Sequence, residues 1–202
     1  MKSNTILAVV PMRSGSKGII DKNIKELCGK PLFYWVLSAL EQSEVDRIVV
    51  LTDSHEYAKK VKSFFPQEKV QICFRSKEMS EDTTSTEDTV LEYIEFSEPE
   101  EEFILLAQLT SPLLDKKDVD EFVNHYLITD SFSQLSVVNL SHRFFWNTNG
   151  ESKNYDYRNR PRRQDIDYSQ IENSYFVENG AMYMNSVAKW KEDRCRLSAS
   201  VS

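Results

Sequence analysis

Short apolar segments alternate with segments of helical periodicity along most of this chain, and this alternation constrains its fold more than any other feature. Runs of β-branched and apolar residues with polar ends predict buried strands at Thr5–Pro11, Arg47–Thr52, Val70–Arg75 and Phe103–Gln108. Apolar residues at helical spacing predict helices between them, at Pro31–Ser43, Ser54–Phe65 and Thr86–Phe96. This order predicts an α/β fold in which helices cover a mainly parallel sheet.

The later part of the chain continues the alternation with one interruption. Lys116–Leu127 has the spacing of another helix, and Ser133–Val138 and Gly180–Asn185 are predicted strands. The 202 residues suit a single α/β domain over 1–202, without repeats or low-complexity linkers. The interruption, residues 139–177, is rich in aromatic residues, asparagine and arginine. Because a structureless loop of that length is uncommon in a compact domain, we expect an extended arm that packs on another surface, such as a second subunit.

Composition excludes several classes of protein. With 40% hydrophobic and 28% charged residues, the chain has the balance of a folded globular protein. Its formal charge of −7 argues against nonspecific nucleic-acid binding, which needs a dominant basic face. The apolar run Ile6–Pro11 is too short for a signal-peptide core or a membrane span, so an intracellular chain without membrane insertion is predicted. Cys28, Cys73 and Cys195 lack CxxC spacing and predict neither a disulfide framework nor a zinc site.

The loop after the first predicted strand has the composition of a polyphosphate site. It supplies two glycines that permit close backbone approach, two hydroxyls and three cations: Gly15 and Gly18, Ser14 and Ser16, and Arg13, Lys17 and Lys22. Its glycine spacing matches neither a P-loop nor a dinucleotide fingerprint. The alternative, from composition and position alone, is a surface turn with solvated cations.

Three further motifs follow in order: Gln108-Leu-Thr-Ser-Pro-Leu113, Arg160-Pro-Arg-Arg-Gln-Asp165 and Glu178-Asn-Gly-Ala-Met-Tyr183. Together with the first loop, the LTDS string at 51–54 and the segment 75–86, they span the chain from Ile6 to about Met184. In this order and at these separations they resemble the CMP-sialic acid synthetases, also called acylneuraminate cytidylyltransferases. The resemblance implies a nucleotide-diphospho-sugar transferase type of fold, a three-layer α/β/α, Rossmann-like domain, and a homodimer in which the arm 139–177 reaches the neighbouring subunit.

The resemblance also implies roles for individual residues. Around the CTP triphosphate it places Arg13, Ser14, Gly15, Ser16, Lys17, Lys22 and Asn23. Among these, the implied catalytic cations are Arg13, Lys17 and Lys22. It places Arg75 and Ser85 near the cytosine and ribose, and it assigns to the acidic sugar Gln108, Arg163, Gln164 and Tyr183. Without the family, Arg75 reads as an ordinary surface cation, Gln108 as a partner of buried backbone and Tyr183 as a half-buried core residue.

The implied reaction is attack by the anomeric 2-hydroxyl of a sialic-acid-like nonulosonic acid on the α-phosphorus of CTP, giving a CMP-sugar and pyrophosphate. The resemblance implies Mg²⁺ as cofactor, held in the family by an Asp-x-Asp string near the C-terminal end. This chain has no such string, so its metal ligands are unassigned and its last residues, 194–202, are atypical or truncated for the family. A fragment or altered reading frame, a partner that supplies the missing part, and a diverged protein are all open.

Several functions therefore remain as alternatives to sialic acid activation. One is a cytidylyltransferase for another acidic keto-sugar, such as legionaminic, pseudaminic or ketodeoxyoctonic acid. Another is a noncatalytic CTP-binding paralogue that lacks the metal site. A dinucleotide-dependent oxidoreductase is disfavoured by the glycine spacing. The resemblance predicts a cytoplasmic location, or a nuclear one in an animal.

Overall fold

The computed structural model describes residues 4–16, 18–81, 83–129, 131–140, 145–153, 155–159, 162 and 175–202. The chain forms two compact units, one made of residues 1–135 with 180–202 and the other of residues 136–179. The first unit contains almost all of the predicted alternation. The prediction of a single domain with a dimerisation arm stays a prediction.

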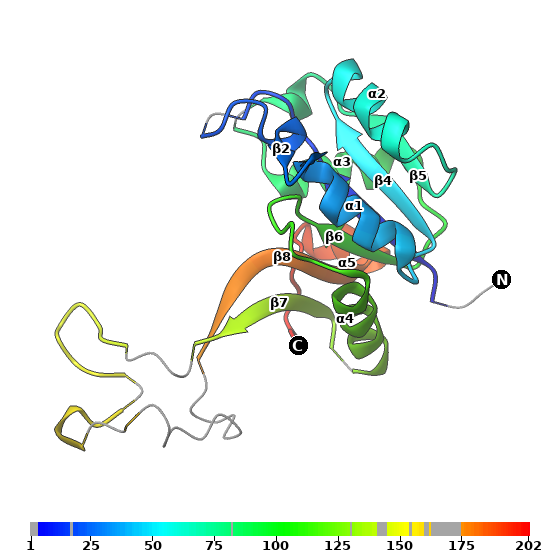
Figure 1. The fold of residues 1–202 in the computed structure, drawn as a ribbon. Helices are drawn as coiled ribbons and strands as arrows, with labels where there is room; N and C mark the ends of the chain where they lie inside the picture. The colour runs from blue at the N-terminus through cyan, green and yellow to red at the C-terminus, as the bar shows by residue number, and fades with distance from the viewer. Residues whose placement is uncertain are drawn as a thin grey trace. The chain divides into compact units, whose positions relative to one another are not determined.

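A six-stranded sheet in the order β5-β4-β1-β6-β8-β7 forms the framework (Figure 1). Its strands are β1 (Ile6–Pro11), β4 (Arg47–Thr52), β5 (Val70–Phe74), β6 (Phe103–Ala107), β7 (Ser133–Asn139) and β8 (Phe176–Ser186). β1 pairs in parallel with both β4 and β6, and β4 pairs in parallel with β5. β8 runs antiparallel to β6 and begins at Phe176, earlier than the sequence predicts. The mainly parallel sheet is therefore confirmed.

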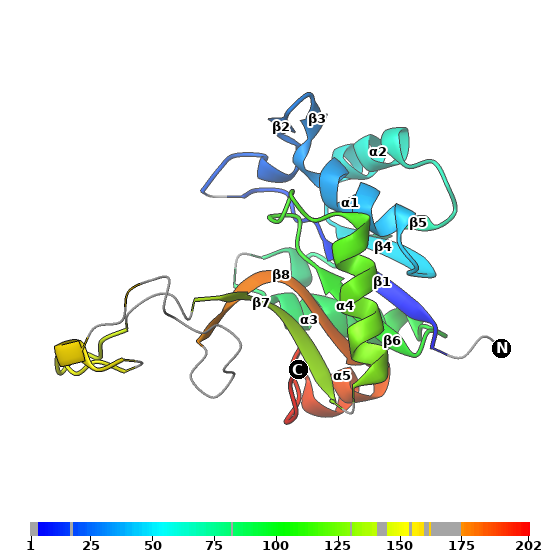
Figure 2. The ribbon, with the colours of Figure 1, turned by 60° about the horizontal axis from the view of Figure 1, so that its bottom comes forward.

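Helices cover both faces of this sheet. The helices are α1 (Leu32–Gln42), α2 (His55–Phe64), α3 (Thr86–Ser97), α4 (Lys116–Ile128) and α5 (Val187–Asp193). Single 3₁₀ turns occur at η1 (Lys22–Ile24), η2 (Glu78–Ser80) and η3 (Tyr157–Asn159), and β2 (Glu26–Leu27) pairs with β3 (Lys30–Pro31). α1 and α4 are neighbours on one face, as Figures 1 and 2 show. None of the helices in the described part of the chain has both the length and the hydropathy needed to cross a membrane.

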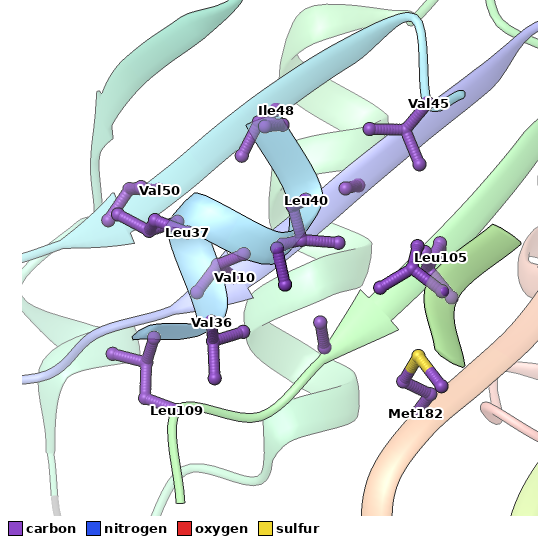
Figure 3. Close-up of a cluster of buried hydrophobic side chains, with 14 of the residues drawn as sticks. Val10, Val36, Leu37, Leu40, Val45, Ile48, Val50, Leu105, Leu109 and Met182 are labelled. Atoms are coloured by element: carbon purple, nitrogen blue, oxygen red, sulfur yellow. The ribbon is translucent and has the colours of Figure 1, made fainter. Parts of the chain in front are cut away.

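The alternation of side chains along each strand separates two apolar cores. Val10, Ile48 and Leu105 pack with residues of α1 (Figure 3), and the same core includes residues of α2 and α4. Leu7 and Val49 occupy the alternate positions of β1 and β4, and they pack with residues of α3 and α5 on the other face. Because both faces are buried, the strands read as continuous apolar runs. The predicted three-layer arrangement is thus observed.

The last residues of the chain lie against the beginning of β7. Ser133 forms a parallel bridge with Val201, and its backbone N–H donates to the carbonyl of Ser200 (2.9 Å). Ser198 accepts a hydrogen bond from Asn185 Nδ2 (2.9 Å) and donates one to Asp193 (2.6 Å). These contacts fasten residues 198–202 to the sheet.

The second unit has its own contacts among its described residues. Leu140 donates a backbone hydrogen bond to Tyr175 (2.7 Å), and the ring of Phe145 stacks on Tyr175 with centroids 5.0 Å apart. Trp146 pairs with Ser152 in an antiparallel bridge. The predicted dimerisation role of 139–177 rests on the family resemblance.

Candidate functional site

A pocket of about 240 Å³ opens at the carboxyl ends of β1, β5 and β6, the edge of the sheet that the fold predicts for a ligand. Its lining comes from the loop after β1, the end of β5, the start of α3 and the loop after β6: Pro11, Arg13, Ser16, Lys22, Asn23, Arg75, Thr84, Ser85, Thr86, Thr89, Gln108, Leu109 and Thr110. Most of the predicted site residues that the structure describes therefore meet in one place. Lys17, Arg163 and Gln164 lie outside the described residues.

The first loop is tied to the end of β4 through Ser14. The backbone N–H and the hydroxyl of Ser14 both donate to the carboxylate of Asp53, each at 2.7 Å. Gly15 follows with a φ of +68°, a conformation that a residue with a side chain adopts only with strain. Neither Ser14 nor Gly15 lines the pocket, so their contribution here is to shape the loop.

The second half of the loop is held by Asn23 and Tyr57. Asn23, only 8% exposed, donates through Nδ2 to the carbonyl of Arg13 (2.9 Å), which joins the two ends of the loop. The hydroxyl of Tyr57, from α2, donates to Asp21 Oδ1 (2.8 Å). Asp21 has a φ of +52° and directly precedes the pocket residue Lys22. Burial, followed by the bond to Asp21, raises the pKa of Tyr57 and keeps its hydroxyl protonated as a donor.

Arg75 lies between β5 and α3 with part of its guanidinium unsatisfied. Its Nη2 donates to Thr89 Oγ1 (2.8 Å) and to the carbonyl of Met79. Its Nε is buried and has no hydrogen-bond partner among the described residues. Desolvation lowers the pKa of Arg75, although the group remains charged at neutral pH. A buried donor without a partner is costly, so Arg75 contributes both a charge and an unmet hydrogen-bonding group to this wall of the pocket.

The start of α3 forms a wall of hydroxyl groups. Ser85 is the N-cap: its Oγ accepts from the N–H of Asp88 (3.0 Å) and donates to the Asp88 carboxylate (2.7 Å). Thr89 Oγ1 donates to the carbonyl of Ser85 (3.1 Å). This helix N-terminus also brings a partial positive charge to the pocket edge. Hydrogen bonds within α3 and its N-cap therefore fix the positions of these hydroxyl groups.

The two described residues that were assigned to the sugar, Gln108 and Tyr183, lie in different places. Gln108 lines the pocket, and its backbone N–H donates to Ala181 in β8 (2.9 Å). Tyr183 is only 3% exposed and belongs to the apolar core beneath α3 and α5, where Arg196 lies 4.7 Å from its ring centroid. Its neighbours Met182 and Met184 face the opposite core. The structure does not bring Tyr183 to the pocket.

Some residues that shape the site were not assigned a role from the sequence. Asp53 lies in the LTDS string, and Thr84 and Thr86 lie in the hydroxyl-rich segment that leads into α3, so these motifs contained a usable signal. Tyr57 and Thr89 stand at ordinary core-facing helix positions. Only the tertiary structure distinguishes them from packing residues.

The described lining of the pocket does not fit a protein-held Mg²⁺ site. Mg²⁺ prefers carboxylate and other oxygen ligands, often with substrate phosphates. The lining residues include no carboxylate, and the described residues contain no group of three His, Cys, Asp or Glu that could hold a metal. What the pocket offers is cationic and hydroxyl donors, which suit an anionic ligand.

Sequence comparison places these features in a family. Residues 7–188 match the family described as Cytidylyltransferase. The chain is 34% identical to N-acylneuraminate cytidylyltransferase B of Danio rerio, covering 91% of this chain and 42% of the relative. It is 35% identical to N-acylneuraminate cytidylyltransferase of Oncorhynchus mykiss, covering 85% and 40%. It is 29% identical to CMP-N,N'-diacetyllegionaminic acid synthase of Legionella pneumophila, covering 94% and 81%. The chain thus spans less than half the length of the two fish relatives.

Solved structures share the fold. A CMP:2-keto-3-deoxy-manno-octonic acid synthetase complexed with CTP superposes with a TM-score of 0.65 at 17% identity, covering 93% of this chain and 78% of the other. The 4-diphosphocytidyl-2C-methyl-D-erythritol synthase of Anaerococcus prevotii gives 0.63 at 11% identity, covering 96% and 76%. Since the family match covers nearly the whole chain, including the pocket loops and the sheet that carries them, this chain belongs to the cytidylyltransferase family.

Proposed function

We propose that this chain binds CTP in the pocket and transfers its CMP group to a sialic-acid-like nonulosonic acid. The observation that carries the proposal is the meeting of Arg13, Lys22 and Arg75 with the hydroxyl wall of α3 at one edge of the sheet, in a member of the cytidylyltransferase family. The names of the two fish relatives support N-acylneuraminate as the sugar.

The triphosphate lies along the first loop in this proposal. Arg13, Ser16 and Lys22 present cationic and hydroxyl donors, and Lys17 of the same loop is a further predicted cation. The sugar hydroxyl oxygen attacks the α-phosphorus, the bond from that phosphorus to the pyrophosphate oxygen breaks, and the hydroxyl proton passes to solvent. The chain's own contribution is to align the phosphates and to stabilise their charge. No step requires a covalent enzyme intermediate.

The cytidine part lies against the other wall. The guanidinium of Arg75 lies near the base or ribose in this proposal, and the helix start supplies neutral hydroxyl partners. Gln108, which also lines the pocket, faces the sugar in this proposal. Arg163 and Gln164, predicted to face the sugar, belong to the segment for which the family resemblance implies a neighbouring subunit.

The homodimer, the cytoplasmic location and Mg²⁺ are parts of the proposal that rest on the family resemblance alone. A second sugar is favoured by one specific observation: the Legionella relative, which is named for legionaminic acid, is matched over 81% of its own length.

Pyrophosphate release tests the proposal. The 202-residue chain is incubated with CTP and each of N-acetylneuraminic, legionaminic, pseudaminic and ketodeoxyoctonic acid, with and without Mg²⁺, while CTP binding is measured by calorimetry. Pyrophosphate release with N-acetylneuraminic acid supports the proposal. Release with only one of the other sugars would show that this sugar is the substrate instead. CTP binding without release from any sugar identifies a noncatalytic binder. Failure to bind CTP overturns the proposal.

A further inference from the structure

We propose that Arg196, in the segment that follows α5, positions the nucleotide-facing turn of α3 through Glu87. The proposal deepens the proposed function and rests on it for the identity of the ligand. Arg196 contacts Glu87 and Tyr183, neither of which lines the pocket, so its role is positioning rather than catalysis.

The contact between the two residues is a forked ion pair. Nη2 of Arg196 donates to Oε2 of Glu87 at 2.8 Å, and Nε of Arg196 donates to Oε1. The side chains are only 19% and 24% exposed, so water screens the pair less than an ordinary surface pair. The guanidinium also lies over the ring of Tyr183, 4.7 Å from its centroid, which fixes its plane.

Glu87 stands on the side of α3 that faces away from the pocket. Ser85, Thr86 and Thr89 line the pocket, and Glu87 lies between them in the sequence, in the first turn of the helix. Successive helical residues are rotated by about 100°, so Glu87 and Thr89 project about 200° apart. The first turn is consequently contacted by the pocket on one side and by Arg196 on the other.

Thr89 carries the position of this turn to Arg75. Its hydroxyl accepts from Arg75 Nη2 at 2.8 Å and donates to the carbonyl of the N-cap Ser85 at 3.1 Å. A displacement of the first turn therefore moves the Thr89 hydroxyl, which is a side-chain acceptor of Arg75. The position of Arg75 in the pocket would then change, although every lining residue would still be present.

The segment that carries Arg196 is itself anchored. The N–H of Ser198 donates to Ser133 Oγ (2.9 Å), and Ser198 Oγ is bonded to both Asn185 and Asp193. Arg196 therefore acts from a fixed base on the sheet. The contact joins residues 109 positions apart in the chain, which no local pattern would reveal.

A second forked pair provides a matched control. Arg47 donates to Glu101 at 2.6 and 2.7 Å, with side chains 28% and 11% exposed. These residues lie at the amino ends of β4 and β6, the opposite end of the strands from the pocket. We expect the loss of this pair to change the stability of the chain but to leave the first turn of α3 in place.

The test compares Arg196→Gln and Glu87→Gln with Arg47→Gln in the full chain, under conditions where each variant is folded. Amide hydrogen exchange of Asp88 and Thr89 is measured without ligand, and the Kd for CTP is measured by calorimetry. We expect faster exchange at these two amides and a roughly three- to tenfold weaker CTP affinity in the first two variants only. The charge-swapped double variant, Arg196→Glu with Glu87→Arg, is expected to recover part of the amide protection and part of the CTP affinity.

Equal changes in Arg47→Gln, or unchanged Asp88 and Thr89 exchange in Arg196→Gln, would overturn the positioning role. Faster amide exchange in Arg196→Gln without a change in CTP affinity would also overturn it. If the unmodified chain fails to bind CTP, the proposed function fails, while the exchange measurement still decides whether Arg196 controls the turn.

Discussion

The two walls of the pocket achieve their shape by different means. The loop wall, residues 12–16 and 18–24, has positive φ at Gly15 and Asp21, and it is held from outside by Asp53 and Tyr57. The α3 wall is a regular helix start closed by its own capping box. The loop presents charge, whereas α3 presents mainly neutral hydroxyls beside Arg75. One wall is suited to phosphates and the other to the neutral part of a nucleotide.

The largest effect that separates the walls is expected from Arg13→Ala. Loss of a charge-assisted contact to phosphate costs about 1.5–3 kcal/mol, which weakens CTP binding roughly ten- to hundredfold. Cytidine, which has no phosphate, should bind with nearly unchanged affinity. Calorimetry with both ligands measures this, with Lys59→Ala on exposed α2 surface as the control. An equal loss for cytidine would place Arg13 on the wrong part of the ligand.

Thr89→Val should have the next largest effect, and it tests the α3 wall. The substitution keeps the shape of the side chain but removes the acceptor of Arg75 Nη2. We expect CTP and cytidine affinity to fall alike by about 1 kcal/mol, roughly fivefold. The same titrations measure this. A loss confined to CTP would contradict the division between the walls.

Tyr57→Phe should have a smaller effect on binding, because it removes an anchor of the loop and not a lining group. The buried hydroxyl bond to Asp21 contributes about 1 kcal/mol to the free energy of unfolding. CTP affinity should fall by a factor of about three, since the loop loses order but keeps its cations. Tyr126→Phe, which removes a hydroxyl bonded to the carbonyl of Phe132, is the matched control for urea unfolding and calorimetry. If both variants bind CTP equally well, the anchor has no effect on the site.

The smallest expected effect is a change in stability at acid pH, and it tests the ion pair between Glu87 of α3 and Arg196. Hydrogen bonds from Arg196 lower the pKa of Glu87 below its ordinary value of 4.5. A lowered carboxylate pKa adds stability that is complete above that value and is lost as pH falls through the folded-state pKa. The stability difference between the unmodified chain and Glu87→Gln should therefore shrink below about pH 4.5. Urea unfolding from pH 7 to pH 3 measures it, and a constant difference would contradict the ion pair.

Much of the fold follows from short-range patterns. The predicted strand Arg47–Thr52 is β4, and the helix predicted at Thr86–Phe96 is α3 with one further residue. Glycines and cations after the first strand predict a phosphate-binding loop, and the structure brings Arg13, Ser16 and Lys22 to one pocket. Local periodicity decides these features because strands and helices are set by neighbouring residues.

The sequence by itself determined the α/β alternation, the strand ends at which the pocket opens and the family to which the motifs belong. Only the tertiary structure decided the face of Tyr183, the use of Ser14 as a link to Asp53 and the contact of Arg196 with Glu87. Strand β8 is buried on both faces from Ala181 to Asn185, so its apolar pattern does not say which way Tyr183 points. The pairing of Arg196 with Glu87 depends on how the whole sheet folds, because contacts between residues distant in sequence have no local signature.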